Sequence, residues 1–269
     1  MRAQALHPDV LLLTSAVLAV NCVVVRATLQ EPAGEGEAFV IDSPVLPEEL
    51  DSLPGLLDQA GFPEPDGLLA THGDWDHLLG RLAFPGLALG CAESTLSRLQ
   101  ARPGEAQRGL RDFDEDLMIE RPGPLALGSL QGLPVPGRLD IADRELELHP
   151  TGGHTEDGMA VLIGWAGVLV AGDYLSASEI PSIHDHGGLD AYAETLERLR
   201  PLVERCEHVI PGHGPLLDRE RASSVLDEDV AYLQRLREQG SQAQLPEGRR
   251  GRVQRRLHAQ NVAGLGSAQ

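Results

Sequence analysis

Apolar residues along the chain fall into short runs that predict strands, separated by segments with leucine at helical spacing. The longest mostly apolar stretch, residues 10–25, is rich in valine and is interrupted by Thr14, Ser15 and Asn21. It is too short and too broken for a membrane helix, and no convincing small-residue cleavage site marks a signal peptide. Because β-branched residues favour extended backbone, it predicts two strands, and residues 38–42 predict a third.

Other segments supply the remaining elements of the expected fold. Short apolar or alternating runs predict strands at 66–70, 87–91, 145–149, 168–171 and 208–210, with further short strands within 125–148 and 159–170. Leucine spacing and capping residues predict helices at 47–60, 93–100, 190–204 and 223–239, and a helix beginning at 78–82. Residues 102–124 are charged and proline-rich and are expected to form a solvated insertion. Strands followed by helices in both halves predict two packed sheets flanked by helices.

Residues 71–77 read THGDWDH and place four metal-capable side chains in six consecutive positions. On an extended segment alternate residues point the same way, so His72 and Asp74 can converge on one ion. Asp76 and His77 are adjacent, and in a turn that opens a helix they can reach a second ion. The alternative is a polar turn in which Asp74 or Asp76 only caps the helix that follows.

Three further motifs favour the metal site. The strand expected at 145–149 runs into TGGHT, where two glycines allow a sharp turn that presents His154. The apolar run at 168–171 ends in Gly-Asp with Asp173, and the run at 208–210 ends in PGHG with His213. Functional groups gather on loops at one edge of a sheet scaffold, so this placement is typical of a functional site.

In this order, THGDWDH, TGGHT, the Gly-Asp after an apolar strand and PGHG resemble the signature of the metallo-β-lactamase superfamily. The PGHGP ending is similar to the glyoxalase II-like branch. The resemblance covers roughly residues 10–240 and implies an αββα sandwich of two mixed β-sheets flanked by helices, with a dinuclear metal site. It implies that His72, Asp74 and His154 hold one metal, that Asp76, His77 and His213 hold the other, and that Asp173 bridges them.

One position departs from the commonest family pattern, which has histidine where this chain has Asp74. A carboxylate lowers the charge of the site by one, so a bound water is expected to be a weaker acid. A hard oxygen ligand also favours iron or manganese relative to zinc, although zinc accepts carboxylates. The resemblance therefore implies two divalent metal ions, with zinc as the first expectation and iron or manganese as alternatives.

Two neighbouring cations can activate a shared water and stabilise the oxyanion that forms when it attacks. We therefore expect a metal-dependent hydrolase that uses a metal-bound hydroxide on an ester, thioester or lactone, with Asp76 and Asp173 as its catalytic carboxylates. The alternatives are a di-iron redox protein of the flavodiiron-like branch, a nuclease or phosphodiesterase of the same fold, and a non-catalytic binding protein. The expected partner is a small-molecule substrate, and a homodimer is left open.

Composition excludes several functions. The 269 residues are 42% hydrophobic, which suits one large domain, or a core domain with a small appendage. A net charge of −19 argues against a surface built for nucleic acid or anionic lipid. The absence of lysine excludes a Walker P-loop and a Schiff base. Cys22, Cys91 and Cys206 are widely spaced, which predicts neither disulfides nor metal ligation and favours the cytoplasm.

The last segment differs in charge from the body of the chain. We expect a metal-binding domain at 1–240 and a basic C-terminal segment at 241–269, in which no acid follows Glu247. Its five arginines, Arg249, Arg250, Arg252, Arg255 and Arg256, are expected to belong to a terminal helix docked through Val253 and Leu257 rather than to a nucleic-acid site. His184, Asp185 and His186 are further candidates for a substrate pocket.

Overall fold

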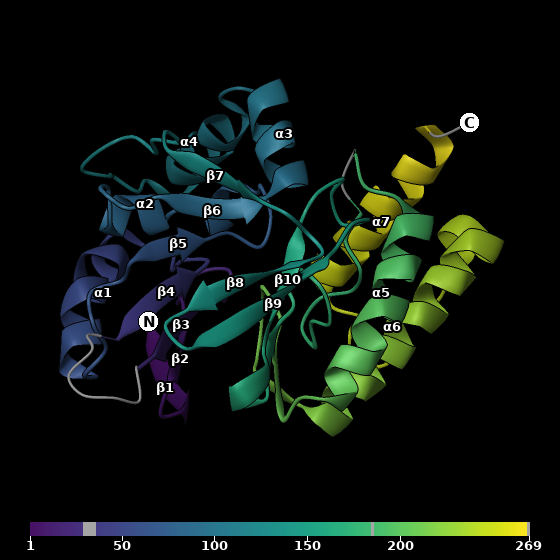
Figure 1. Cartoon of the computed structure of the whole chain (residues 1–269). Coiled ribbons are helices and arrows are strands. Elements are labelled where there is room, and N and C mark those ends of the chain that lie inside the picture. The colour runs from purple at the N-terminus through teal and green to yellow at the C-terminus, as the bar shows by residue number, and fades with distance from the viewer. Residues whose placement is uncertain (29–35, 184–185, 268–269) are drawn as a thin grey trace. The chain divides into compact units, whose positions relative to one another are not determined.

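A computed structural model of the chain describes residues 1–28, 36–183 and 186–267 (Figure 1). The pocket candidates His184 and Asp185 lie outside the described residues. The chain divides into two compact units, Met1–His149 (unit 1) and Pro150–Gln269 (unit 2). Each unit has a β-sheet, helices and a hydrophobic core of its own.

Unit 1 contains a seven-stranded mixed sheet in the order β1-β2-β3-β4-β5-β6-β7 (Figure 1). The strands are β1 (Arg2–His7), β2 (Val10–Thr14), β3 (Asn21–Ala27), β4 (Glu37–Ile41), β5 (Gly67–Leu69), β6 (Leu89–Ala92) and β7 (Leu130–Leu133). The first four pair antiparallel, and β4 to β7 pair in parallel. The predicted strands from 10–25 and 38–42 are confirmed, whereas β1 was not predicted because its mostly exposed residues lack an apolar pattern.

Four helices accompany this sheet, and a hairpin follows it. The helices are α1 (Pro47–Gln59), α2 (Gly80–Ala83), α3 (Glu93–Ala101) and α4 (Glu105–Leu117), and the hairpin consists of β8 (Gly137–Ile141) and β9 (Arg144–Pro150). Helix α1 begins at a proline, which suits a first helical position, and buries Leu50, Leu53 and Leu57 in the core. Each buried leucine contributes about 1.5–3 kcal/mol.

Two segments of unit 1 differ from the sequence prediction. Residues 102–124, expected as a solvated insertion, contain the 13-residue helix α4. Ala106 and Leu110 are buried, and Phe113 packs on Trp75 with ring centroids 4.6 Å apart. The helical spacing of these three apolar residues was not recognised because charged residues surround them. The helix expected from 78–82 is only the four-residue α2, preceded by the 3₁₀ turn η1 (Trp75–His77).

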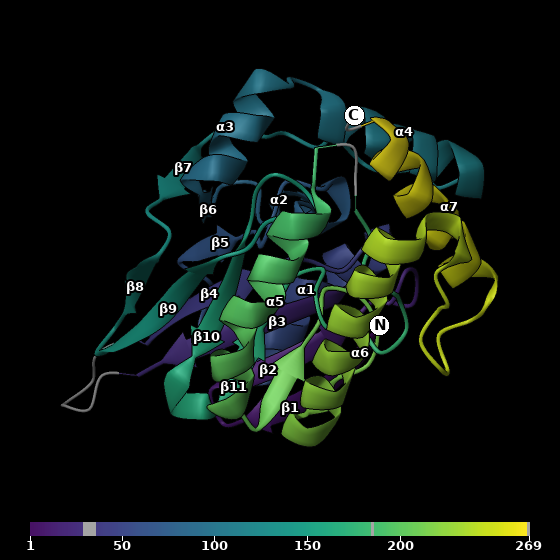
Figure 2. The same cartoon turned by 90° about the vertical axis from the view of Figure 1, so that its right-hand side faces the viewer.

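Unit 2 contains four strands paired in the order β13-β12-β11-β10. These are β10 (Met159–Ile163), β11 (Val168–Val170), β12 (His208–Ile210) and β13 (Leu217–Asp218), and the helices are α5 (Leu189–Glu204), α6 (Arg219–Gln239) and α7 (Arg252–Ser267). The sheet is mixed, because only β11 and β12 run parallel. Helices α5 and α6 lie side by side in both views (Figures 1 and 2).

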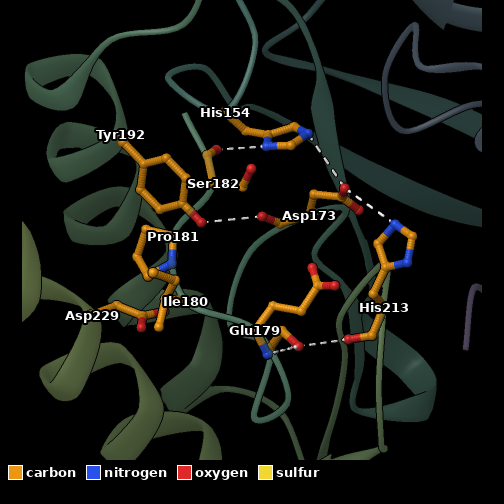
Figure 3. A pocket seen from close by; sticks show the side chains of 10 residues that line it. His154, Asp173, Glu179, Ile180, Pro181, Ser182, Tyr192, His213 and Asp229 are labelled. Carbon is orange, nitrogen blue, oxygen red and sulfur yellow. Dashed lines mark hydrogen bonds and ion pairs between the residues drawn. The ribbon is translucent and has the colours of Figure 1, made fainter. Parts of the chain in front are cut away.

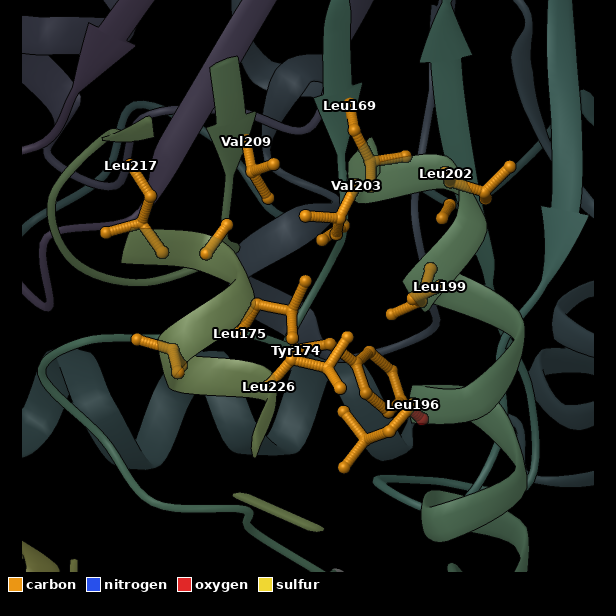
Figure 4. Close-up of a cluster of buried hydrophobic side chains, with 14 of the residues drawn as sticks. Leu169, Tyr174, Leu175, Leu196, Leu199, Leu202, Val203, Val209, Leu217 and Leu226 are labelled. Carbon is orange, nitrogen blue, oxygen red and sulfur yellow. The ribbon is translucent and has the colours of Figure 1, made fainter. Parts of the chain in front are cut away.

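The core of unit 2 lies between α5, α6 and the sheet. Leu196, Leu199 and Val203 of α5 are buried together with Leu169 of β11 and Val209 of β12 (Figure 4). The leucines fall on one face of α5 because they are spaced three or four residues apart. This packing fixes the ends of β11 and β12, after which Asp173 and His213 follow in the sequence.

The C-terminal helix α7 contributes Leu257, Val262 and Leu265 to the same core. Val253, which was expected to face inward, is 46% exposed, so that part of the prediction is wrong. Arg249 is buried, whereas Arg250 and the other three arginines of the segment are exposed. No helix in the described part of the chain is long and apolar enough to span a membrane. The expected two mixed β-sheets flanked by helices are confirmed.

Candidate metal centre

In unit 1, the four candidate ligands follow the buried strand β5. His72 and Asp74 lie in the connecting loop, and Asp76 and His77 belong to η1. The Nε2 atom of His72 is 3.6 Å from Asp74 Oδ2, and that of His77 is 3.9 Å from Asp76 Oδ2. The two imidazole rings lie 4.2 Å apart between centroids. The strand-to-turn arrangement predicted from THGDWDH therefore gathers all four side chains.

Asp42, just after β4, orients both histidines. Its Oδ1 accepts the backbone N–H of Thr71 at 2.8 Å, and its Oδ2 accepts the Thr71 hydroxyl at 2.9 Å. The same Oδ2 is 2.9 Å from His77 Nδ1, which must donate because the partner is a carboxylate. Since the Thr71 hydroxyl proton goes to Asp42, that hydroxyl can only accept from His72 Nδ1 at 3.1 Å. Both histidines thus carry the Nδ1 proton and direct Nε2 toward a carboxylate.

Asp74 has a cationic partner that was not recognised in the sequence. Arg98 of α3 places Nη2 at 2.7 Å from Asp74 Oδ1. The two side chains are 10% and 15% exposed, so the charges are largely shielded from water. Arg98 restores the unit of positive charge that Asp74 removes relative to histidine. The lower charge expected from aspartate in place of histidine at position 74 is therefore offset by Arg98 in unit 1.

In unit 2, the three candidate ligands follow three strands. His154 lies between β9 and β10, Asp173 follows β11, and His213 follows β12. The Nε2 atoms of His154 and His213 are both 3.3 Å from Asp173 Oδ2 (Figure 3). Two nitrogens and one oxygen from sequence-distant loops thus converge.

Two buried tyrosines and a carbonyl fix this arrangement. His154 Nδ1 is 2.7 Å from the Ser182 carbonyl oxygen, so it carries the proton here as well. The Tyr174 hydroxyl accepts the His154 backbone N–H at 3.1 Å, and the Tyr192 hydroxyl donates to the Asp173 carbonyl oxygen at 3.1 Å (Figure 3). Burial raises the pKa of both tyrosines above the usual value, so these hydroxyls stay protonated and act as positioning groups.

The turn before His154 depends on glycine. Gly153 has φ +110°, and a Cβ there would lie 2.1 Å from the backbone nitrogen of Tyr192. We expect Gly153→Ala to lower the free energy of unfolding by about 3 kcal/mol or more, because overpacking and an unfavourable φ act together. Chemical denaturation measures this change. Gly152→Ala is the matched control, since a Cβ at Gly152 meets nothing within 4 Å. Equal losses in the two variants would contradict the steric explanation.

The distances between donor atoms in unit 2 fit a bound metal. Ligand atoms around a tetrahedral ion at about 2.0–2.1 Å lie about 3.3 Å from one another. This separation matches the distances from Asp173 Oδ2 to His154 and His213 Nε2. The partner of Nδ1 fixes the ligating tautomer of His72, His77 and His154, as is usual for metal-binding histidines. Imidazole and carboxylate together suit zinc, iron and manganese.

One predicted pocket residue belongs to neither ligand set, and two residues that contact the unit 1 site were not predicted. His186, a pocket candidate, is exposed on a turn. Asp42 and Arg98 were missed because they lie 29 and 24 residues from the side chains they contact, Thr71 and Asp74, and no local motif marks them. The only signal for Asp42 was its position at the end of a predicted strand.

Comparisons with known proteins agree with this architecture. The family profile described as "Metallo-beta-lactamase superfamily" matches residues 16–213. No curated protein matches the chain in sequence.

Solved structures share the fold at low identity. A beta-lactamase domain protein from Burkholderia ambifaria has a TM-score of 0.66 and 19% identity, covering 98% of this chain and 88% of its own. A metallo-beta-lactamase family protein from Thermus thermophilus has a TM-score of 0.64 and 20% identity, covering 97% and 95%. A stereoselective inverting sec-alkylsulfatase from Pseudomonas sp. has a TM-score of 0.71 and 13% identity, covering 99% of this chain and 50% of its own. At these identities the likeness shows the fold alone.

Proposed function

Because the chain belongs to the metallo-β-lactamase superfamily, we propose that it is a metal-dependent hydrolase acting on an ester, thioester or lactone. The observation that carries this proposal is the convergence of His154 and His213 Nε2 on one oxygen of Asp173. In His154 the Nδ1 contact with the Ser182 carbonyl oxygen directs Nε2 toward this carboxylate, which is the arrangement usual for metal-binding histidines. The proposed ligands are His72, Asp74, Asp76, His77, His154, Asp173 and His213.

Two divalent ions are proposed, with zinc first and iron or manganese as alternatives. Bound metal would supply Lewis acidity, lower the pKa of a water and stabilise an oxyanion. The protein's own contribution is to fix the donor atoms. Asp42, Thr71 and the Ser182 carbonyl hold three histidines in the ligating tautomer. The Asp173 carboxylate lies between the imidazoles of His154 and His213. Asp76 is proposed to accept a proton from the attacking water and to return it to the leaving group.

One sequence motif supports the proposed substrate class. The PGHGP sequence at 211–215 is similar to the glyoxalase II-like branch, which favours thioesters and related esters. The proposed chemistry needs no serine, cysteine or lysine nucleophile, in keeping with a chain that has no lysine.

Metal analysis followed by a substrate panel tests the proposal. The protein is purified without added metal, stripped with a chelator, and assayed with esters, thioesters, lactones and phosphodiesters before and after zinc, manganese or iron is returned. Metal-dependent hydrolysis of a carboxylic ester, thioester or lactone supports the proposal. Activity on phosphodiesters alone favours the nuclease or phosphodiesterase alternative. Oxygen or nitric oxide reduction by the iron form without hydrolysis favours the di-iron alternative.

The Asp74–Arg98 pair predicts how metal preference can be changed. In the Asp74→His/Arg98→Gln double variant an imidazole replaces a hard carboxylate, and the cation that paired with the carboxylate is removed. We expect the ratio of zinc to manganese affinity to rise about tenfold or more, because imidazole suits zinc better than manganese. Competition titrations against a chelator measure both affinities. Arg98→Gln alone is the control, and an unchanged ratio in the double variant would show that Asp74 is not a ligand.

A further inference from the structure

The C-terminal segment forms hydrogen bonds with the loop that contacts two candidate ligands of unit 2, His154 and His213. Residues 174–183, here called the bracing loop, follow Asp173 in the sequence. Two polar side chains from beyond the matched family region of 16–213, Arg249 and Asn261, donate hydrogen bonds to this loop. They are 1% and 2% exposed, so both are built into the interior of unit 2.

Asn261 of α7 holds the second half of the bracing loop. Its Nδ2 donates to the Pro181 carbonyl oxygen at 2.7 Å, and its Oδ1 accepts the Ile183 backbone N–H at 2.9 Å. These two bonds flank Ser182, whose carbonyl oxygen accepts the His154 Nδ1 proton at 2.7 Å. Asn261 therefore contacts the backbone on both sides of the residue whose carbonyl oxygen contacts His154.

Arg249 holds the first half of the same loop. Its Nη1 donates to the carbonyl oxygens of Ser176 at 3.0 Å and Glu179 at 2.8 Å. Ser176 in turn donates its hydroxyl to the His213 carbonyl oxygen at 2.8 Å. Figure 3 shows Glu179, Ser182 and both histidines around the same pocket.

Arg249 is itself held by acidic residues of α6. Its Nη1 is 2.6 Å from Asp229 and its Nη2 is 3.0 Å from Glu228. Burial raises the pKa of Asp229 to about 7, and the guanidinium opposes that rise. The guanidinium fork of Arg249 contacts two carboxylates and two carbonyl oxygens, so its position is fixed from several sides.

We infer that Arg249 and Asn261 are positioning residues for the metal ligands His213 and His154, so that the C-terminal segment is part of the metal-binding apparatus. The inference rests on the proposed function for the identity of the ligands. The mechanism is indirect, because each residue fixes a backbone carbonyl or hydroxyl that contacts a histidine. Comparable partners of metal-binding histidines change metal affinity about 10- to 100-fold when they are removed.

Asn261→Ala is the main test, with Val262→Ala as its matched control. Val262 packs on the same core from the next position of α7, so its truncation weakens docking of the helix without removing a hydrogen bond to the bracing loop. We expect Asn261→Ala to weaken zinc binding about 10- to 100-fold. Val262→Ala should leave zinc affinity nearly unchanged at a similar loss of thermal stability. Arg249→Lys, which keeps the charge opposite Asp229 but loses the fork, should also weaken zinc binding.

A measurement without metal separates this inference from the proposed function. In metal-free protein labelled with ¹⁵N-histidine, NMR should show His154 as the Nδ1–H tautomer with a protected ring proton, and Asn261→Ala should lose that protection. Should the wild type bind no zinc, the proposed function fails, while the tautomer result still decides whether Asn261 positions His154. Unchanged His154 signals in Asn261→Ala, or equal zinc affinity in Asn261→Ala and Val262→Ala, would overturn the inference.

Discussion

Metal-replete protein is expected to hold close to two divalent ions per chain, and a His77→Ala/His213→Ala variant is expected to hold close to one. Both substitutions remove an imidazole from the ligand set of the same proposed ion, whereas the ligands proposed for the other ion are unchanged. Hydrolytic activity should fall steeply, because the proposed reaction uses a water that two ions activate together. Elemental analysis after gel filtration gives the stoichiometry, and a fluorogenic ester or lactone gives the activity.

His7→Ala is the control for the loss of an imidazole as such. His7 lies in β1, where its Nδ1 accepts the Asp9 backbone N–H at 3.1 Å, and it belongs to neither ligand set. We expect this variant to keep both metal ions and the activity. Full metal occupancy in the double variant, or a stoichiometry near zero in the wild type, would contradict the proposed ligands.

The strand ends with the candidate ligands were predictable because a strand-like run, a turn with glycine and a metal-capable side chain are adjacent there. Asp173 and His213 each follow a short apolar run at a Gly-Asp or Pro-Gly turn, and His154 follows a pair of glycines. The positive φ of Gly153 shows that one of these glycines is required by the backbone itself. Local chemistry of this kind can be inferred from one sequence, since the turn and the functional residue are adjacent.

Contacts that depend on tertiary packing could not be predicted in the same way. Arg98 looked like an ordinary basic residue of a predicted helix, and its pairing with Asp74 follows only from the position of α3 in unit 1. Arg249 was expected as one of five similar arginines, yet only its side chain is buried against Asp229. Helix α4 was missed because its few apolar residues are outnumbered by charges, and packing on Trp75 decides its structure.

Asp42→Ala is expected to have a large effect on the stability of unit 1. The side chain is 2% exposed and accepts from Thr71 N, Thr71 Oγ1 and His77 Nδ1, so alanine would leave three buried donors without their acceptor. Each such loss costs about 1–3 kcal/mol. The φ of +58° at Asp42 adds about 1 kcal/mol or more for alanine, because aspartate tolerates this left-handed region better. We therefore expect a loss of about 4 kcal/mol or more in metal-free protein, measured by chemical denaturation.

Asp42→Asn separates the backbone role of this residue from its role toward the histidines. Asparagine tolerates the left-handed φ and keeps one acceptor oxygen, so the loss of stability should be clearly smaller than for alanine. It cannot offer a carboxylate to both Thr71 and His77, so zinc affinity should still fall about 10- to 100-fold. Asp66→Ala serves as a control in the same sheet, because Asp66 is exposed and accepts the Ala38 backbone N–H at 2.9 Å. Wild-type zinc affinity in Asp42→Asn would show that the Nδ1 contact does not set the ligating tautomer of His77, and the orienting role assigned to Asp42 would then be wrong.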